Sequence, residues 1–233
     1  MRGARRSTTV VAAVVMTLGL AACSGDGDER RPVDGTVVQP GKPGEKSKTL
    51  DEAPTVAPQR ANDADVEFAQ MMIPHHAQAL EMAELAPQAG GSRAVRVLAD
   101  RIDGAQRPEI VQMASWLREQ GLKAPTKAQI ESGRIPMGRL GGHGDHGSHG
   151  GHDVDSMPGM ASEKQLATLK KARGRAFDKQ FLTLMVLHHQ GALEMSSKVA
   201  RLGSDQRINE LATGIAADQT AEIDRMRQLL ARM

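Results

Sequence analysis

The feature that most constrains the fold of this chain is an internal repeat with a constant offset of 113 residues. The pattern F-x3-M-x2-HH-x3-LEM begins at Phe68 and again at Phe181, and Q-x2-EI-x2-M begins at Gln106 and again at Gln219. The offset holds without a gap over about 50 residues, which chance rarely produces. Each half is therefore expected to be one unit of two helices.

Helix signals divide the first repeat into two helices. The first is predicted over residues 63–87, and Ser92 caps a second helix that ends before Gly121. Pro74 and Pro108 fall inside these helices, where each removes a backbone hydrogen bond, so both helices are expected to kink.

The second repeat carries matching signals. Ser162 and Gln165 have the spacing of a capping box, which predicts a third helical stretch to about Leu202, with a possible break near Gly174. A fourth helix then runs almost to Met233. Two hairpins, each with one apolar stripe, must bury those stripes against each other, so the sequence predicts an all-α four-helix bundle.

The amino-terminal region is typical of an exported lipoprotein. Residues 1–22 combine early arginines with a short apolar run over 10–20, which is the layout of a secretory signal. Cys23 follows in a stretch that resembles a bacterial lipobox, and diacylation there would anchor the chain to the outer face of the cell membrane. The alternative is an ordinary signal peptide with an incidental cysteine. Residues 23–60 lack apolar periodicity and are interpreted as a flexible linker.

The predicted domain and its charge exclude some classes of function. Residues 61–233 form the bundle domain, with repeat one at 62–121, a His-rich loop at 141–152 and repeat two at 162–233. Without the signal, 27 basic residues remain against 28 acidic ones, so no nucleic-acid partner is indicated. The single cysteine allows no internal disulfide.

The histidines and helical methionines are grouped rather than scattered. Projection at the helical period places one histidine of each pair and two methionines on the same inward face of the first helix of each repeat. A further methionine of each second helix could meet them. The candidate metal ligands are Met72, His75, His76, Met82 and Met113 in repeat one, Met185, His188, His189, Met195 and Met226 in repeat two, and His143, His146, His149 and His152 in the loop.

This donor set is soft and neutral. Imidazole with thioether sulfur, and without thiolate or a carboxylate cluster, favours copper(I) and by extension silver(I) over magnesium, calcium or manganese. Methionine binds without losing a proton, which suits an exported site. Zinc, which prefers nitrogen and oxygen donors, fits the loop histidines better than the methionine-lined interior.

Plainer interpretations stay open at this point. Methionine at helical spacing commonly fills a core, and Gln106 or Gln219 could hydrogen-bond a structural histidine. Glu109 and Glu222 are better placed as solvated or supporting groups than as ligands.

The repeated motifs, together with MPGM at 157–160, resemble the bacterial domain-of-unknown-function family numbered 305. The resemblance covers about residues 60–233. It implies a ferritin-like four-helix bundle, and some members of the family resemble periplasmic copper-binding proteins. It assigns the ten helical candidates above to two motif sets, one in each repeat, and the His-rich loop is an addition to the shared pattern.

Three functions are compared. The favoured one is copper binding at the cell surface for buffering, sequestration or transfer to a metal-trafficking protein. A di-iron enzyme would need Glu-x-x-His motifs, which the sequence lacks. The remaining alternative is a metal-free interaction module. No nucleophile with a base, phosphate loop or redox cysteine pair is visible, so no catalysis is expected.

Overall fold

The computed structural model describes residues 37–39, 44–50, 60–135 and 157–233. The chain divides into two units, Met1–Val56 and Ala57–Met233. The predicted signal, Cys23 and the His-rich loop lie outside the described residues, so these three features stay predictions.

The first unit contains a short antiparallel hairpin within the predicted linker. Strand β1 (Val37–Gln39) pairs with β2 (Lys48–Leu50), and Val37 lies opposite Leu50. The sequence predicted no element here. Both strands are rich in residues that favour extended backbone, which accounts for the pairing.

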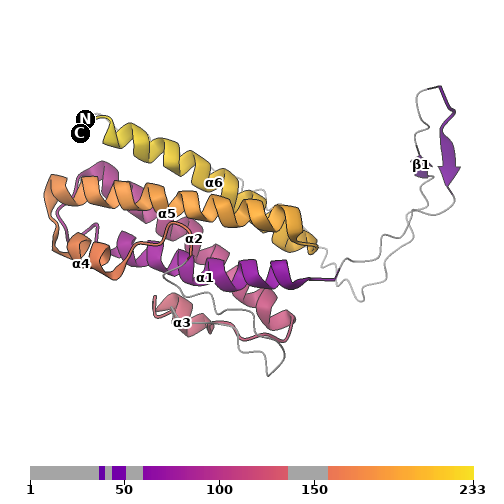
Figure 1. Ribbon diagram of the computed structural model, residues 1–233, viewed down its shortest axis with the longest axis horizontal. Coiled ribbons are helices and arrows are strands. Elements are labelled where there is room, and N and C mark those ends of the chain that lie inside the picture. The colour runs from indigo at the N-terminus through magenta and orange to yellow at the C-terminus, as the bar shows by residue number, and fades with distance from the viewer. Residues whose placement is uncertain (1–36, 40–43, 51–59, 136–156) are drawn as a thin grey trace, which may run out of the picture. The chain divides into compact units, whose positions relative to one another are not determined.

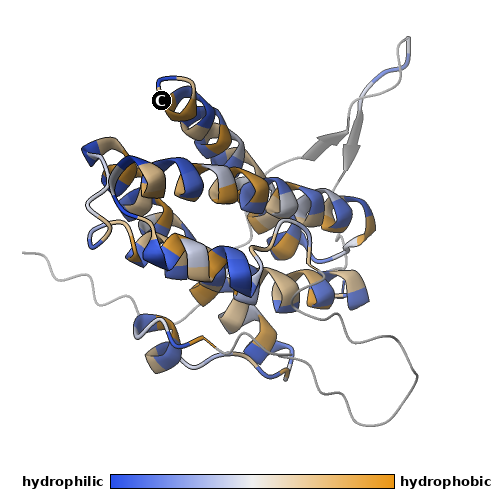
Figure 2. Cartoon of the chain, turned by 60° about the vertical axis from the view of Figure 1, so that its left-hand side comes forward, coloured by the Kyte–Doolittle hydropathy of each residue, from blue (hydrophilic) through white to orange (hydrophobic). Residues whose placement is uncertain are grey.

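The second unit is an all-α bundle of four long helices, as the duplication predicted (Figure 1). Its first helix packs on the second, its third long helix packs on the fourth, and the first and third long helices join the two hairpins. Polar and apolar residues alternate around each helix (Figure 2). Two shorter helices accompany the bundle. The six are α1 (Asp63–Glu84), α2 (Arg93–Glu119), α3 (Lys127–Glu131), α4 (Glu163–Lys171), α5 (Gly174–Leu202) and α6 (Gln206–Leu230).

Most predicted helix ends are confirmed. The Ser92 hydroxyl accepts from the backbone of Val95 at 3.3 Å, and Ser162 forms its capping box with Gln165. The third helical stretch does break, because Gly174 has φ +54° where α5 begins. Helix α1 ends at Glu84, three residues earlier than predicted, and turns follow it.

The two prolines lie inside their helices as expected. Helix α1 continues through Pro74 and α2 continues through Pro108. None of the helices in the described ranges is both long and apolar enough to cross a bilayer.

Two aspartates at equivalent repeat positions connect the hairpins. Asp65 of α1 accepts from the backbone N–H groups of Ser204 and Asp205, both at 3.0 Å, just before α6. Asp178 of α5 accepts from the backbone of Ser92, just before α2, at 2.9 and 3.1 Å. Each hairpin thus supplies a carboxylate that holds the start of the other hairpin's second helix, and α1 lies antiparallel to α5.

Candidate metal centre

Two histidines from different repeats meet in the middle of the bundle. The ring centroids of His75 in α1 and His188 in α5 lie 3.7 Å apart, with the rings tilted by 33°. The neighbouring His76 and His189 complete a set of four imidazoles, all completely buried. The structure therefore brings together the two histidine pairs that the repeat predicted.

The outer histidine of each pair is held by a glutamate of the adjacent helix. His76 Nε2 lies 2.8 Å from Glu109 Oε2, and His189 Nε2 lies 2.8 Å from Glu222 Oε2. An ionised carboxylate only accepts, so each Nε2 carries the proton and donates. In the neutral imidazole each Nδ1 then has a bare lone pair, and both Nδ1 atoms are buried without a partner. Carboxylates that orient histidines in this way are a recurrent feature around metal ligands.

The inner histidines differ from each other. His75 Nε2 donates to the backbone carbonyl of Pro158 at 3.0 Å, which leaves its buried Nδ1 without a partner. Neither ring nitrogen of His188 makes a hydrogen bond. Each of the four imidazoles therefore presents at least one nitrogen lone pair that no protein group uses.

Burial keeps the inner pair neutral. Removal from water, with smaller contributions from the neighbouring histidines, lowers the pKa of His75 to about 3, although the hydrogen bond to the Pro158 carbonyl opposes the shift. Burial likewise lowers the pKa of His188 well below its ordinary value, as do the neighbouring histidines, and the nearby backbone of His75 opposes this only in part. Neutral imidazole is the form that binds metal, so no proton has to leave these two side chains first.

Unpartnered polar atoms concentrate at this centre. Among the described residues, nine of the fourteen buried side-chain nitrogen and oxygen atoms without a hydrogen bond belong to the four histidines and to Gln106 and Gln219. The interpretation that Gln106 or Gln219 hydrogen-bonds a core histidine is therefore wrong, because both amides lack partners and His75 bonds to a backbone carbonyl instead. Folded proteins leave few such atoms unpaired, so this cluster of buried donor and acceptor atoms is a candidate binding centre.

The six helical methionines among the candidates are buried in the bundle core, and the antiparallel crossing mixes the two repeats. Five are completely buried and Met195 is 6% exposed. Met195 of repeat two packs in the same apolar cluster as two methionines of repeat one. Met82 of repeat one likewise packs with two methionines of repeat two. The two groups are Met72, Met113 and Met195, and Met185, Met226 and Met82. Proximity in sequence therefore does not decide which methionines lie together.

A short segment before α4, residues 157–161, crosses the centre on one side, and we call it the strap. The Gln78 amide of α1 donates to Ala161 O at 2.8 Å and accepts from Ala161 N at 2.7 Å. Pro158 lies against α5 at Gly191, where an added Cβ would collide with the Pro158 carbonyl. Gln78 and Gly191 occupy equivalent repeat positions but are different residue types. This difference between the repeats was the sequence signal that the strap contacts α1 and α5 in different ways.

The donor chemistry fits a soft ion better than a hard one. Within the ranges that the structure describes, no group of three or more His, Cys, Asp or Glu side chains is arranged to hold a metal. A centre built from the described side chains would thus combine imidazole nitrogen with thioether sulfur, as copper(I) prefers.

Comparison with known proteins identifies relatives along the bundle. The profile of the family described as "Domain of unknown function (DUF305)" matches residues 65–230. Protein L153 of Acanthamoeba polyphaga mimivirus, which is uncharacterised, is 42% identical over 60 residues. That match covers 25% of this chain and 40% of the viral protein, so it spans less than half of that relative.

Solved structures share the fold. A DUF305 fragment from Deinococcus radiodurans has a TM-score of 0.59 at 31% identity, covering 74% of this chain and 99% of that one. A candidate secreted DUF305 protein from Streptomyces coelicolor has a TM-score of 0.58 at 27% identity, covering 72% and 93%. CopM in its Cu(II)-bound form has a TM-score of 0.52 at 30% identity, covering 72% and 96%, and CopM is also solved with Cu(I) and with silver.

Proposed function

The chain belongs to the DUF305 family, and we propose that it is an extracytoplasmic protein that binds copper through the histidines and methionines of its bundle core. One observation carries the proposal: four buried imidazoles each present a lone pair that the protein leaves unused. Leaving a buried polar atom unpaired costs about 1–3 kcal/mol. A bound metal ion would offset part of that cost by taking up imidazole lone pairs together with thioether sulfur.

The arrangement around the imidazoles supports the same proposal. Glu109 and Glu222 fix the orientation and tautomer of His76 and His189, which leaves Nδ1 as the donor atom. Thioethers fill much of the adjoining apolar core. CopM, which shares the fold, is solved with Cu(I), Cu(II) and silver, and the same soft ions suit this donor set.

The cellular role follows from the predicted export. A chain anchored at Cys23 on the outer face of the membrane would buffer or sequester copper, or hand it to a trafficking partner. The loop histidines His143, His146, His149 and His152 would add weaker sites that also accept zinc.

A di-iron enzyme is disfavoured by the position of the carboxylates. Glu81 pairs with Lys170 at 2.7 Å and Glu194 is exposed, so neither reaches the core histidines. The two glutamates that do reach the histidines, Glu109 and Glu222, already accept hydrogen bonds from the histidine N–H groups.

Copper(I) titration of residues 24–233, which exclude the cysteine thiol, tests the proposal. We expect buried-site binding that is lost in the double variant His75→Ala/His188→Ala and retained when residues 141–152 are deleted. At 100 times the dissociation constant, the ion should stabilise the fold by about 2.7 kcal/mol. Unchanged melting temperature and unchanged histidine NMR shifts on adding copper would reject the proposal and favour the metal-free module.

A further inference from the structure

The duplication creates two equivalent places along the contact between α1 and α5, and their side chains differ in exposure to solvent. At one of them, Phe68, Met71 and Met195 line a cavity of about 290 Å³ that opens to solvent. Their repeat equivalents are Phe181, Leu184 and Met82. All three of those are buried in one apolar cluster, whereas Met71 at the first position is partly exposed.

Helix α4 closes the second position. Leu169 of α4 is completely buried in the same cluster as Phe181 and Met82. Lys170 of α4 pairs with Glu81, whose repeat equivalent is Glu194 at the open cavity. Among the residues that the structure describes, no helix covers the matching position of the first repeat, where the cavity lies.

One residue difference also enlarges the open position. Ala64 lines the cavity, whereas its equivalent Phe177 is completely buried and stacks on Phe181 with ring centroids 5.7 Å apart. A phenyl ring that fills space in the second repeat is therefore replaced by a methyl group in the first.

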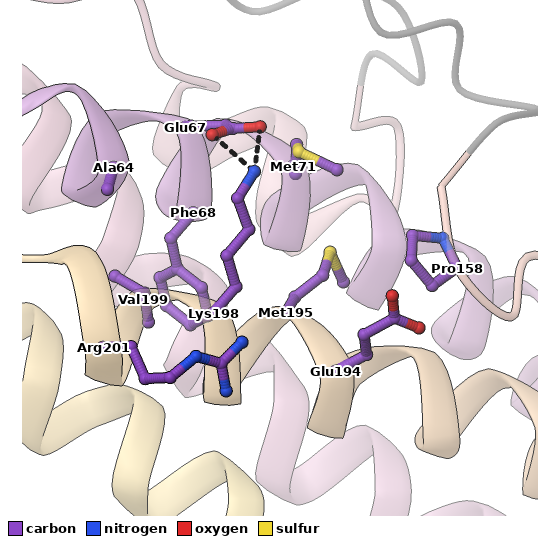
Figure 3. A pocket seen from close by; sticks show the side chains of 10 residues that line it. All are labelled: Ala64, Glu67, Phe68, Met71, Pro158, Glu194, Met195, Lys198, Val199 and Arg201. Atoms are coloured by element: carbon purple, nitrogen blue, oxygen red, sulfur yellow. Dashed lines mark hydrogen bonds and ion pairs between the residues drawn. The ribbon is translucent and has the colours of Figure 1, made fainter.

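The open cavity has thioethers on both walls. Figure 3 shows Met71 projecting from α1 and Met195 from α5, with Pro158 and Glu194 at one end. Lys198 pairs with Glu67 at 2.8 Å across the rim. We call this cavity the thioether groove.

The groove leads toward the candidate centre. Met195 packs in the same cluster as Met72 and Met113, and the carbonyl of Pro158 accepts from His75. Met71 is partly exposed and Met195 is nearly buried, so the two sulfurs form successive steps from solvent to core. Glu194 places a carboxylate at one end of the cavity beside Pro158, and Arg201 adds a positive charge to the lining, so the thioethers rather than net charge would select the ion.

We propose that the thioether groove is the entrance at which a soft monovalent ion, Cu(I) or Ag(I), first binds between Met71 and Met195 before it reaches the core histidines. This inference rests on the proposed function. It makes the two halves of the duplication unequal: one half admits the ion, and the half covered by α4 does not.

Stopped-flow transfer of Ag(I) from a weak chelator to residues 24–233 tests the entrance. Ala64→Phe copies the ring of the second repeat and fills the groove, and Met71→Leu removes the outer sulfur at nearly constant volume. Each variant should slow uptake about tenfold, equivalent to about 1.4 kcal/mol in the activation free energy. Stoichiometry and equilibrium affinity should stay within about twofold of wild type, because the core donors are intact. Met233→Leu, the same change at the chain end, should leave the rate unaltered.

The outcomes separate the two proposals. If the wild-type chain takes up no Ag(I) at equilibrium, the proposed function fails and the entrance fails with it. If it binds Ag(I) and both variants load at the wild-type rate, the entrance alone is overturned. Should Ala64→Phe not fold, Met71→Leu decides the question by itself.

Discussion

The imidazole rings of His75 and His188 face each other at 3.7 Å across the contact between α1 and α5. These two residues are equivalents in the duplication, so the centre lies where the halves meet rather than inside either half. One shared centre is consequently expected, in place of two independent sites, one in each repeat.

Replacing His188 with leucine should stabilise the metal-free protein. Both ring nitrogens of His188 are buried without partners, and an apolar side chain of similar size removes that cost. We expect His188→Leu to raise the free energy of unfolding by about 1–2 kcal/mol and to weaken copper binding. Urea unfolding without metal at pH 7.5, followed by circular dichroism, measures the first effect. A clear loss of stability would mean that His188 has a partner in the apo protein.

The neighbouring substitution should have the opposite effect on stability. His189 donates to Glu222, which is nearly buried, so His189→Leu strands a carboxylate in the core. Loss of one member of a buried pair costs about 3 kcal/mol or more. The same urea titration compares the two variants, and equal effects of both would contradict the assigned hydrogen bonds.

The glutamates should tune metal affinity without binding the ion. Glu222→Gln keeps the shape of the side chain and removes the charge that orients His189, so copper affinity should fall about 10–100-fold. Competition with a copper(I) chelator measures the change. Glu210→Gln, at an exposed position of the same helix, is the matched control and should bind as wild type.

The metal-free protein should lose stability on mild acidification. Burial lowers the pKa of His75 from 6.5 to about 3 and lowers that of His188 too, so below pH 6.5 the unfolded chain takes up protons that the folded one refuses. The free energy of unfolding should fall by about 1.4 kcal/mol per pH unit for each of the two histidines. Above pH 6.5 this effect vanishes. Urea midpoints from pH 7.5 to 5 report it, and His188→Leu should flatten the slope.

Loss of the Asp65 carboxylate, which joins the hairpins, should lower the free energy of unfolding far more than loss of the Asp63 carboxylate. Asp65 is completely buried and accepts from the backbone of Asn62, Ser204 and Asp205, so Asp65→Ala leaves three donors unpaired. We expect a loss of about 3 kcal/mol or more. The control is Asp63→Ala in the same helical turn, an exposed position where less than about 1 kcal/mol is expected. Thermal unfolding compares the two, and equal losses would show that Asp65 does not join the hairpins.

Local patterns in the sequence were sufficient for the helices and for the composition of the centre. The caps at Ser92 and Ser162 and the helical period of His75 and Met72 each depend on residues within a few turns, and the 113-residue offset shows that the same local pattern occurs twice. Such signals predicted four long helices with histidines and methionines facing inward, and the structure confirms both.

Other features depend on contacts between distant segments, which no local pattern encodes. The antiparallel crossing of α1 and α5 sets the 3.7 Å approach of the histidine rings and places Met195 in the same apolar cluster as Met72. The strap gives His75 a partner and leaves His188 without one. Helix α4 covers one half of the duplication, whereas no helix among the described residues covers the cavity in the other half. Helical periodicity therefore specified which side chains face the core, but only the packing of the hairpins determined which of their polar atoms remain free to bind an ion.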